Sequence, residues 1–298
     1  MEVISSAAFA RLHPTGTHPE TPTRIRALLD AFPEALEPRP ARREDIERCH
    51  TAAYVDRIRA IEAETWLDPD TVASATTYDA ALLAAGAATE AVERGGFALA
   101  RPPGHHALPD RAMGFCIFDS IAIAARWAQA ELGFGRLAIV DWDVHHGNGT
   151  QAIFWDDPTV LYVSLHQWPF YPGTGGPSEG NETTLNVPLP AGSGDDEYLN
   201  AFERAVEPAV KTFGADLVLV SAGFDAHAAD PIALMELTEE GFRELARRSA
   251  RLGPRVAAVL EGGYNLETLP YLVRAAFEGF HEANGRPPGR PFNTPERC

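Results

Sequence analysis

Five short segments of the chain carry the side chains best suited to chemistry. Each is rich in His, Asp, Glu or Tyr, and each follows directly on an apolar run. They are RPPGHHA (101–107), DWDVHHGNG (141–149), SLHQW (164–168), SAGFDAH (221–227) and EGGY (261–264). Polar groups at the ends of buried runs are costly unless they are paired or bind something. The segments therefore indicate a ligand-binding or catalytic site, provided that the fold brings them together.

The segment DWDVHHGNG has the pattern of a metal site. Residues two apart in an extended strand share a face, so Asp141, Asp143 and His145 point the same way. Two carboxylates on one face of a buried strand need a cation to offset their charge. Asp143 and His145 suit a divalent first-row metal such as zinc, and Asp225 is the best-placed third ligand. Three protein ligands leave a position open for water, as in catalytic zinc sites, while a hydrogen-bonded Asp–His pair in a loop is the alternative.

Other side chains could supply proton transfer, oxyanion stabilisation and a binding slot. His105 and His106 follow a rigid Pro-Pro-Gly turn and could be ligands or acid–base groups. We favour acid–base catalysis, because the metal site is already complete without them. Tyr264 follows two glycines and could donate a hydrogen bond to an oxyanion. Phe115 and Tyr171 could form aromatic walls around an apolar stem, or could simply belong to the core.

The elements that must position these residues follow from the pattern of apolar residues. Five runs rich in Val, Ile and Leu predict strands at Phe97–Ala100, Leu137–Val140, Val160–Leu165, Leu217–Val220 and Val256–Leu260. Helical patterns occur at Pro22–Ala31, Ala52–Ile61, Tyr78–Arg94, Ser120–Leu132, Asp196–Phe213, Thr238–Leu252 and Leu269–Ala283. This alternation predicts a doubly wound α/β fold whose parallel strands all end at one edge, where such folds bind ligands.

Composition limits the class of protein. The chain has 298 residues and a formal net charge of −17, which argues against a nucleic-acid partner. The three cysteines (Cys49, Cys116 and Cys298) are widely spaced, which suits a reducing compartment. The sequence has neither a membrane-spanning apolar run nor a basic signal peptide, so we expect a cytoplasmic protein with no membrane partner. We expect one domain over 1–283 and a surface tail rich in Pro, Gly and Arg over 284–298.

The chain resembles the histone deacetylase family, including its bacterial histone deacetylase-like and acetylpolyamine amidohydrolases. The resemblance is carried by RPPGHHA, GFC, DWDVHHGNGTQ, SLHQ with FYPGTG, SAGFDAH and LEGGY, in family order. It begins at HPETPTR (18–24) and extends to about residue 280, and the LEGGY form is closer to the class II branch. The resemblance implies an arginase/deacetylase fold with a mostly parallel eight-stranded sheet and helices on both faces.

The resemblance also implies roles for single residues. It implies zinc on Asp143, His145 and Asp225, with His106 as the principal base and acid, His105 assisting and Tyr264 binding the oxyanion. Asp141 would be the hydrogen-bond partner of His105, and Asn148 that of His106. The remaining implied roles are a structural potassium ion, an acyl-lysine tunnel and a rim carboxylate. Potassium would be held by Asp141, Asp143, His145, Ser164 and Leu165; the tunnel would be formed by Gly114, Phe115 and Tyr171; the rim carboxylate would be Asp70. A second monovalent cation would lie near Phe154, Asp157, Val160 and Thr183.

The resulting hypothesis is a zinc-dependent amidohydrolase that removes acetyl groups from the ε-amino group of lysine in proteins or peptides. The alternative substrate is an acetylpolyamine or another small acyl amide. Polyamine-specialised relatives carry a glutamate where this chain has Ile232, which favours peptide-like or broad substrates. Two rivals are a binuclear-manganese ureohydrolase, which would need a carboxylate in place of Gly147, and a non-catalytic acyl-lysine binder. The sequence leaves the preferred acyl chain and the oligomeric state open.

Overall fold

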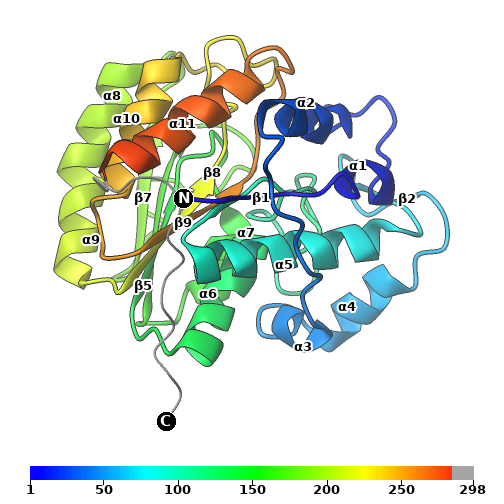
Figure 1. Cartoon of the computed structure of the whole chain (residues 1–298). Helices are drawn as coiled ribbons and strands as arrows, with labels where there is room; N and C mark the ends of the chain where they lie inside the picture. Colours follow the sequence, from blue (N-terminus) through cyan, green and yellow to red (C-terminus); the bar gives the residue numbers. More distant parts are fainter. Residues whose placement is uncertain (284–298) are drawn as a thin grey trace.

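A central parallel sheet runs between two layers of helices in the computed structural model, which describes residues 1–283 (Figure 1). The strand order is β1-β4-β9-β8-β5-β6-β7, and every neighbouring pair is parallel. The strands are β1 (Val3–Ile4), β4 (Phe97–Ala98), β5 (Leu137–Asp141), β6 (Val160–Gln167), β7 (Thr184–Leu189), β8 (Leu217–Ala222) and β9 (Val256–Leu260). A separate antiparallel pair comprises β2 (Thr65–Trp66) and β3 (Val72–Ala73).

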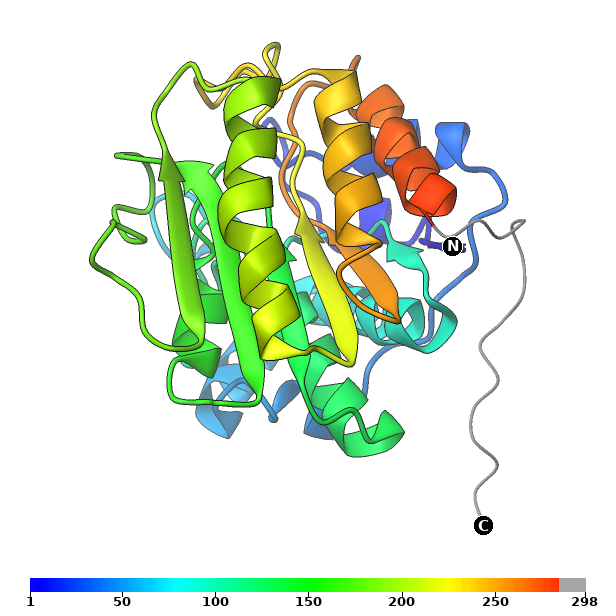
Figure 2. The same ribbon diagram turned by 90° about the vertical axis from the view of Figure 1, so that its left-hand side faces the viewer.

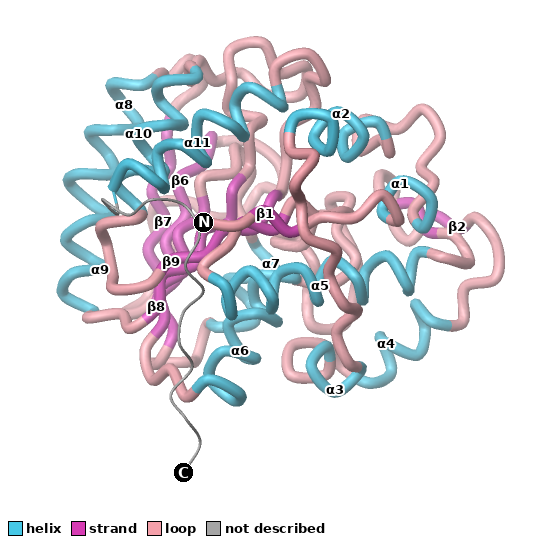
Figure 3. The backbone as a smooth tube through the Cα atoms, viewed as in Figure 1, coloured by secondary structure: helices cyan, strands magenta, loops and turns pink. Residues whose placement is uncertain are grey.

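Helices cover both faces of the sheet. In Figure 2, α8 (Asp195–Ala201), α9 (Glu207–Phe213), α10 (Glu239–Ser249) and α11 (Leu269–Ala283) lie in front of it. On the opposite side lie α5 (Thr77–Arg94), α6 (Ser120–Leu132) and α7 (Asn148–Phe154). Short helices complete the N-terminal part: α1 (Phe9–Leu12), α2 (Thr23–Ala31), α3 (Arg43–Ile46) and α4 (Ala52–Arg59). Figure 3 shows the strands running through the centre between these helices. In the described part, no helix is long and apolar enough to span a membrane.

The predicted doubly wound α/β fold is confirmed, but the count of eight strands is wrong for residues 1–283, where the main sheet has seven. The eighth position, beside β1, is reduced to one parallel bridge between Ile4 and Leu36. Pro33, Pro38 and Pro40 surround Leu36, and proline cannot donate a ladder hydrogen bond. These prolines therefore explain why no full strand forms at this edge.

The five predicted strands all exist, and two helices and one strand have the predicted bounds. The helix predicted over 196–213 is instead three consecutive segments, because a π-helical turn, η1 (Phe202–Val206), lies between α8 and α9. Pro208 follows that turn, and its missing N–H removes one bond of the regular helical ladder. The predicted tail over 284–298, with Cys298, lies outside the described residues, so the domain boundary stays a prediction.

The central strands explain where the site must lie. All residues of β5, β6, β8 and β9 are buried, as expected for strands covered on both faces. Asp141 is the last residue of β5, and its register partners are Ser164 on β6 and Ser221 on β8. The polar residues therefore follow the apolar parts of the strands, and they start at the same level in β5, β6 and β8.

Candidate active site

Three of the five polar segments, RPPGHHA, DWDVHHGNG and EGGY, help to line one small cavity at the carboxyl edge of the sheet. The cavity has a volume of about 80 Å³. It is lined by Asp70, Pro103, His105, His106, Gly114, Phe115, Cys116, His145, Tyr171, Ile232, Gly262 and Tyr264. Most of the residues predicted for the site thus line one pocket, although they come from separate parts of the chain.

Asp143, His145 and Asp225 form a buried group that could hold a metal ion. One donor atom from each lies within 4.8 Å of the others. His145 Nδ1 lies 3.0 Å from Asp143 Oδ1 and 3.3 Å from Asp225 Oδ2. Asp225 Oδ1 accepts a hydrogen bond from the backbone N–H of Val144, but its buried Oδ2 has no well-aligned hydrogen-bond donor among the described residues. A buried carboxylate oxygen with no well-aligned donor, inside a His/carboxylate group, fits a divalent first-row metal such as zinc.

The electrostatics of this group also fit a cation. Burial and the charge of Asp143 raise the pKa of Asp225. Burial lowers the pKa of His145, but Asp143 and Asp225 outweigh it and raise that pKa to about 9. Two buried carboxylates 3.0 and 3.3 Å from one imidazole nitrogen thus attract positive charge to this point. A bound metal ion would offset the same negative charge.

Glycine is required next to these ligands. The backbone N–H of Gly262 donates to Asp143 Oδ2 at 2.8 Å. A Cβ at Gly262 would come within 2.0 Å of Asp225 Oδ2 and 2.6 Å of Asp143 Oδ2. The glycine in the EGGY segment therefore gives the backbone its close approach to the carboxylates, and this holds them in place.

His105 and His106 lie side by side but have different partners and different charges. His105 Nδ1 lies 3.0 Å from Asp141 Oδ2, and His106 Nδ1 lies 2.8 Å from Asn148 Oδ1. Burial lowers the pKa of His105, but Asp143 and Asp141 outweigh it and raise that pKa well above its usual value. Burial and the charges of His105 and His145 hold the pKa of His106 well below its usual value. At neutral pH, His106 is therefore the neutral member of the pair.

The walls of the cavity are aromatic. The rings of Phe115 and Tyr264 are 5.7 Å apart, and the ring of Tyr171 lies 5.3 Å from that of His106, edge to face in both pairs. Phe115 has a φ of 69°, and the preceding Gly114 has a φ of 56°. This strained turn places Gly114 so close to His106 that a Cβ would lie 2.4 Å from the His106 Cδ2. The aromatic residues thus surround the path to the histidines.

The rim of the cavity is polar. Asp70 lines it, and Tyr171 is 36% exposed, so its hydroxyl-bearing ring reaches the surface. Burial and the neighbouring Asp68 raise the pKa of Asp70. The hydroxyl of Thr71 accepts a hydrogen bond from the backbone N–H of Phe115 at 3.0 Å, which joins the rim to the aromatic wall. The lining of the cavity therefore includes a carboxylate together with aromatic side chains, and the rim role of Asp70 stays a prediction.

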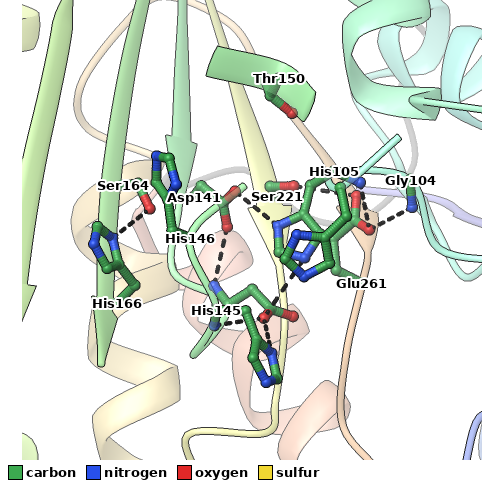
Figure 4. Close-up of polar contacts among 12 residues, drawn as sticks. Gly104, His105, Asp141, His145, His146, Thr150, Ser164, His166, Ser221 and Glu261 are labelled. Carbon is green, nitrogen blue, oxygen red and sulfur yellow. Dashed lines mark hydrogen bonds and ion pairs between the residues drawn. The ribbon is translucent and has the colours of Figure 1, made fainter. Parts of the chain in front are cut away.

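The predicted potassium ligands lie together behind the metal group. Asp141 and Ser164 are opposite each other on β5 and β6, followed by Leu165. Asp141 accepts hydrogen bonds from the backbone N–H of Asp143 at 3.1 Å and from the Tyr162 hydroxyl at 2.9 Å. Figure 4 shows Asp141 between Ser164 and His105. The binding of potassium there stays a prediction.

The residues predicted for a second monovalent cation lie in the turn between α7 and β6 and beside it. The backbone carbonyls of Phe154, Asp157 and Thr183 each accept a backbone N–H, from Asp157, Val160 and Tyr162 respectively. These carbonyls therefore take part in turn and strand contacts, and a cation there also stays a prediction.

Gly147 decides against a second catalytic metal on this strand. A Cβ at Gly147 would lie 2.4 Å from Asp141 Oδ2 and 2.4 Å from the Tyr162 hydroxyl. No side chain fits there without moving both groups. The site therefore has no room at this position for the bridging carboxylate of a binuclear ureohydrolase.

Three buried residues near the site were not predicted to have a role. Glu261 accepts hydrogen bonds from the backbone N–H groups of Gly104 and His105, and Arg24 donates to the backbone carbonyls of Glu261 and Gly263. Asp230 accepts a hydrogen bond from the backbone N–H of Tyr264 at 2.7 Å. Their charges would favour a solvent-exposed position, and the sequence pointed to them only through motif membership, Glu261 in EGGY and Arg24 in HPETPTR.

Comparisons with known proteins agree with one another. Residues 18–280 match the family model described as the histone deacetylase domain. The chain is 42% identical over 287 residues to the histone deacetylase-like amidohydrolase of Pseudomonas aeruginosa, covering 87% of this chain and 75% of that protein. A probable deacetylase of Archaeoglobus fulgidus is 40% identical, with 93% and 86% covered. The crystal structure of acetylpolyamine aminohydrolase from Burkholderia pseudomallei is similar, with a TM-score of 0.85, 28% identity, and 95% and 99% covered.

Proposed function

The chain belongs to the histone deacetylase family, and we propose that it is a zinc-dependent amidohydrolase that removes acetyl groups from the ε-amino group of lysine in proteins or peptides. One observation carries the proposal. The buried Asp143–His145–Asp225 group, in which Asp225 Oδ2 has no well-aligned hydrogen-bond donor in the described part of the chain, lies beside a neutral histidine at the base of an aromatic-walled pocket. Such a pocket accepts an apolar stem with a hydrolysable group at its end.

The proposed mechanism uses the charge difference within the histidine pair. A zinc ion on Asp143, His145 and Asp225 would supply Lewis-acid activation of a water molecule and of the amide carbonyl. His106 donates its Nδ1–H to Asn148, which leaves Nε2 with a free lone pair. Nε2 is thus able to take a proton from the attacking water and later to give it to the leaving amine.

Tyr264 and His105 have supporting roles in this mechanism. Burial raises the pKa of the Tyr264 hydroxyl well above its usual value, so the hydroxyl keeps its proton and can donate it to an oxyanion. Against the effect of burial, Asp143 and Asp141 raise the pKa of His105, which is also hydrogen-bonded to Asp141, and this favours its positively charged form. Its charge helps to keep His106 neutral and stabilises negative charge that develops nearby.

The cavity supports a lysine stem entering from a peptide. Asp70 at the rim can accept a hydrogen bond from a peptide backbone, while Phe115 and Tyr171 flank the path below it. Ile232 lines the same cavity and places an apolar group at its mouth. An acetylpolyamine, the alternative substrate, carries an ammonium group, and an apolar group at the mouth does not help to bind it. We also propose a cytoplasmic location, which the unpaired thiols of Cys49 and Cys116 support.

The test is turnover on an acetyl-lysine peptide, a trifluoroacetyl-lysine reporter and N-acetylputrescine, with metal content measured on the same sample. About one zinc per chain and a higher kcat/KM for the peptide than for N-acetylputrescine are expected. Ile232→Glu should raise the relative kcat/KM for N-acetylputrescine, because a carboxylate at the mouth attracts its ammonium group. Ile232→Gln is the control, because the glutamine side chain has the same length as glutamate but no charge. Preference of the native chain for N-acetylputrescine would assign the alternative, and zinc without turnover would overturn both.

A further inference from the structure

Glu261 is fully buried at the end of β9, and the mechanism above gives it no role. Its Oε2 accepts hydrogen bonds from the backbone N–H of Gly104 at 2.7 Å and from that of His105 at 3.2 Å. Its Oε1 accepts one from the Ser221 hydroxyl at 3.1 Å, at the end of β8. Figure 4 shows the carboxylate beside the backbone of Gly104 and His105. One carboxylate thus joins the ends of β8 and β9 to the turn that carries His105 and His106.

The two N–H groups have few other possible partners. They follow Pro102 and Pro103, which have no N–H, so this segment cannot continue the ladder of β4. Gly104 is also confined on its other side, since a Cβ there would lie 2.6 Å from the backbone N of Ser120. Two buried N–H groups that lost their acceptor would remain unsatisfied or would shift toward another. Either change would move the turn that carries His105 and His106.

Glu261 also belongs to the loop that carries the oxyanion donor. Arg24 donates to its backbone carbonyl at 2.6 Å and to that of Gly263 at 2.7 Å. The next residue, Gly262, donates to Asp143 Oδ2, and Tyr264 is three residues on. The backbone of Glu261 is therefore held with the Tyr264 loop, while its side chain holds the histidine turn.

We propose that Glu261 is a positioning residue that fixes the His105–His106 turn relative to the metal group and the Tyr264 loop. The inference rests on the proposed function for its kinetic consequence, but the geometry it describes is a property of the folded chain. Burial, followed by the charges of Asp141 and Asp143, raises the pKa of Glu261 to about 7. Glutamine can accept the same two N–H bonds with its Oε1 and donate to Ser221 with its Nε2. It should therefore replace glutamate in this role, whereas alanine should not.

The experiment compares Glu261→Ala, Glu261→Gln and the native chain. In Glu261→Ala, loss of the acceptor should lower kcat on an acetyl-lysine reporter by about 10²-fold, because a catalytic group misplaced by about 1 Å has an effect of this size. KM should stay within about twofold of the native value. Glu261→Gln should retain kcat to within about fivefold. Glu90→Ala is the matched control, because Glu90 is also a buried carboxylate, on α5, that accepts a backbone N–H and pairs with Arg39. It should change thermal stability without lowering kcat.

A second readout does not depend on activity. In proton NMR spectra, the Nδ1–H signals of His105 and His106 should be protected in the native chain, in Glu261→Gln and in Glu90→Ala, because both imidazoles are buried and hydrogen-bonded. In Glu261→Ala, at least one of the two should shift or exchange faster. Unchanged signals in Glu261→Ala, or equal kcat in Glu261→Ala and Glu90→Ala, would overturn the inference. An inactive native chain with the expected NMR changes would instead refute the proposed function alone.

Discussion

Replacing Gly114 by alanine should separate backbone strain from displacement of the catalytic base. Gly114 has a φ of 56°, and a Cβ there would lie 2.4 Å from His106 Cδ2 and 2.8 Å from its Cγ. Carbon atoms in contact are ordinarily about 3.5 Å apart or more, so the imidazole must move by about 1 Å. The positive φ alone costs about 1–2 kcal/mol for a residue with a side chain.

The two effects have different readouts. We expect the backbone cost to lower the melting temperature by a few degrees, and the displacement of His106 to lower kcat by about 10²-fold. Gly133→Ala is the matched control, because Gly133 has a φ of 73° with nothing within 4 Å of its Cβ position. It should reduce stability to a similar extent and leave kcat unchanged.

The assay is steady-state hydrolysis of an acetyl-lysine reporter, with thermal unfolding measured on the same preparations. A kcat for Gly114→Ala within threefold of that for Gly133→Ala would refute the reasoning. It would mean that the position of the His106 ring does not limit the reaction.

Three further predictions concern single residues. Tyr264→Phe should lower kcat on the acetyl-lysine reporter by about 10²- to 10³-fold, which is the scale of a lost oxyanion donor. Its zinc content should not change, and nearly intact activity would refute the role of Tyr264. Asn148→Asp places a negative charge beside His106 Nδ1, so it should raise the pKa of His106. The acidic limb of the kcat/KM–pH profile should then move to higher pH. An unshifted limb would contradict the assignment of His106 as base. Burial would raise the pKa of Glu20, but Arg101 outweighs burial and lowers that pKa to about 2. The ionised Glu20 should therefore stabilise the fold above about pH 4.5, and this stabilisation should be lost as the pH falls toward 2. Glu20→Gln should cost about 3–5 kcal/mol in urea unfolding at pH 7 and flatten the pH dependence of stability in that range, and a cost below about 1 kcal/mol would contradict the predicted contribution.

The interior of the fold was predictable because its signals are local and strong. Val256–Leu260 and Ser120–Leu132 have the predicted bounds, the first as a continuous apolar run and the second because Asp119 and Gly133 cap it. The edges were not predicted. β1 has only two residues, and β7 contains Asn186 and Pro188, which weaken the strand pattern. An edge strand is specified by its neighbour in the sheet more than by its own composition.

The candidate site, too, was predictable from the sequence only in part. Residues at strand ends, such as Asp143 and His145, could be placed because parallel strands bring their ends together. Glu261 and Asp230 could not be given roles, because whether a carboxylate is buried depends on the backbone N–H groups that meet it from distant segments. The hydrogen bonds from Gly104 to Glu261 and from Tyr264 to Asp230 span 157 and 34 positions. Sequence spacing gives no signal for such contacts.

The most direct test of the central claim is a zinc titration of metal-stripped protein, followed by turnover of an acetyl-lysine peptide. Turnover should be absent at the start, rise in proportion to added zinc and saturate near one zinc per chain. Asp225→Asn should show little or no rise, because it keeps an oxygen for the Val144 N–H but loses the charge that binds the metal. Full turnover before zinc is added, or an Asp225→Asn titration identical to that of the native chain, would contradict the account.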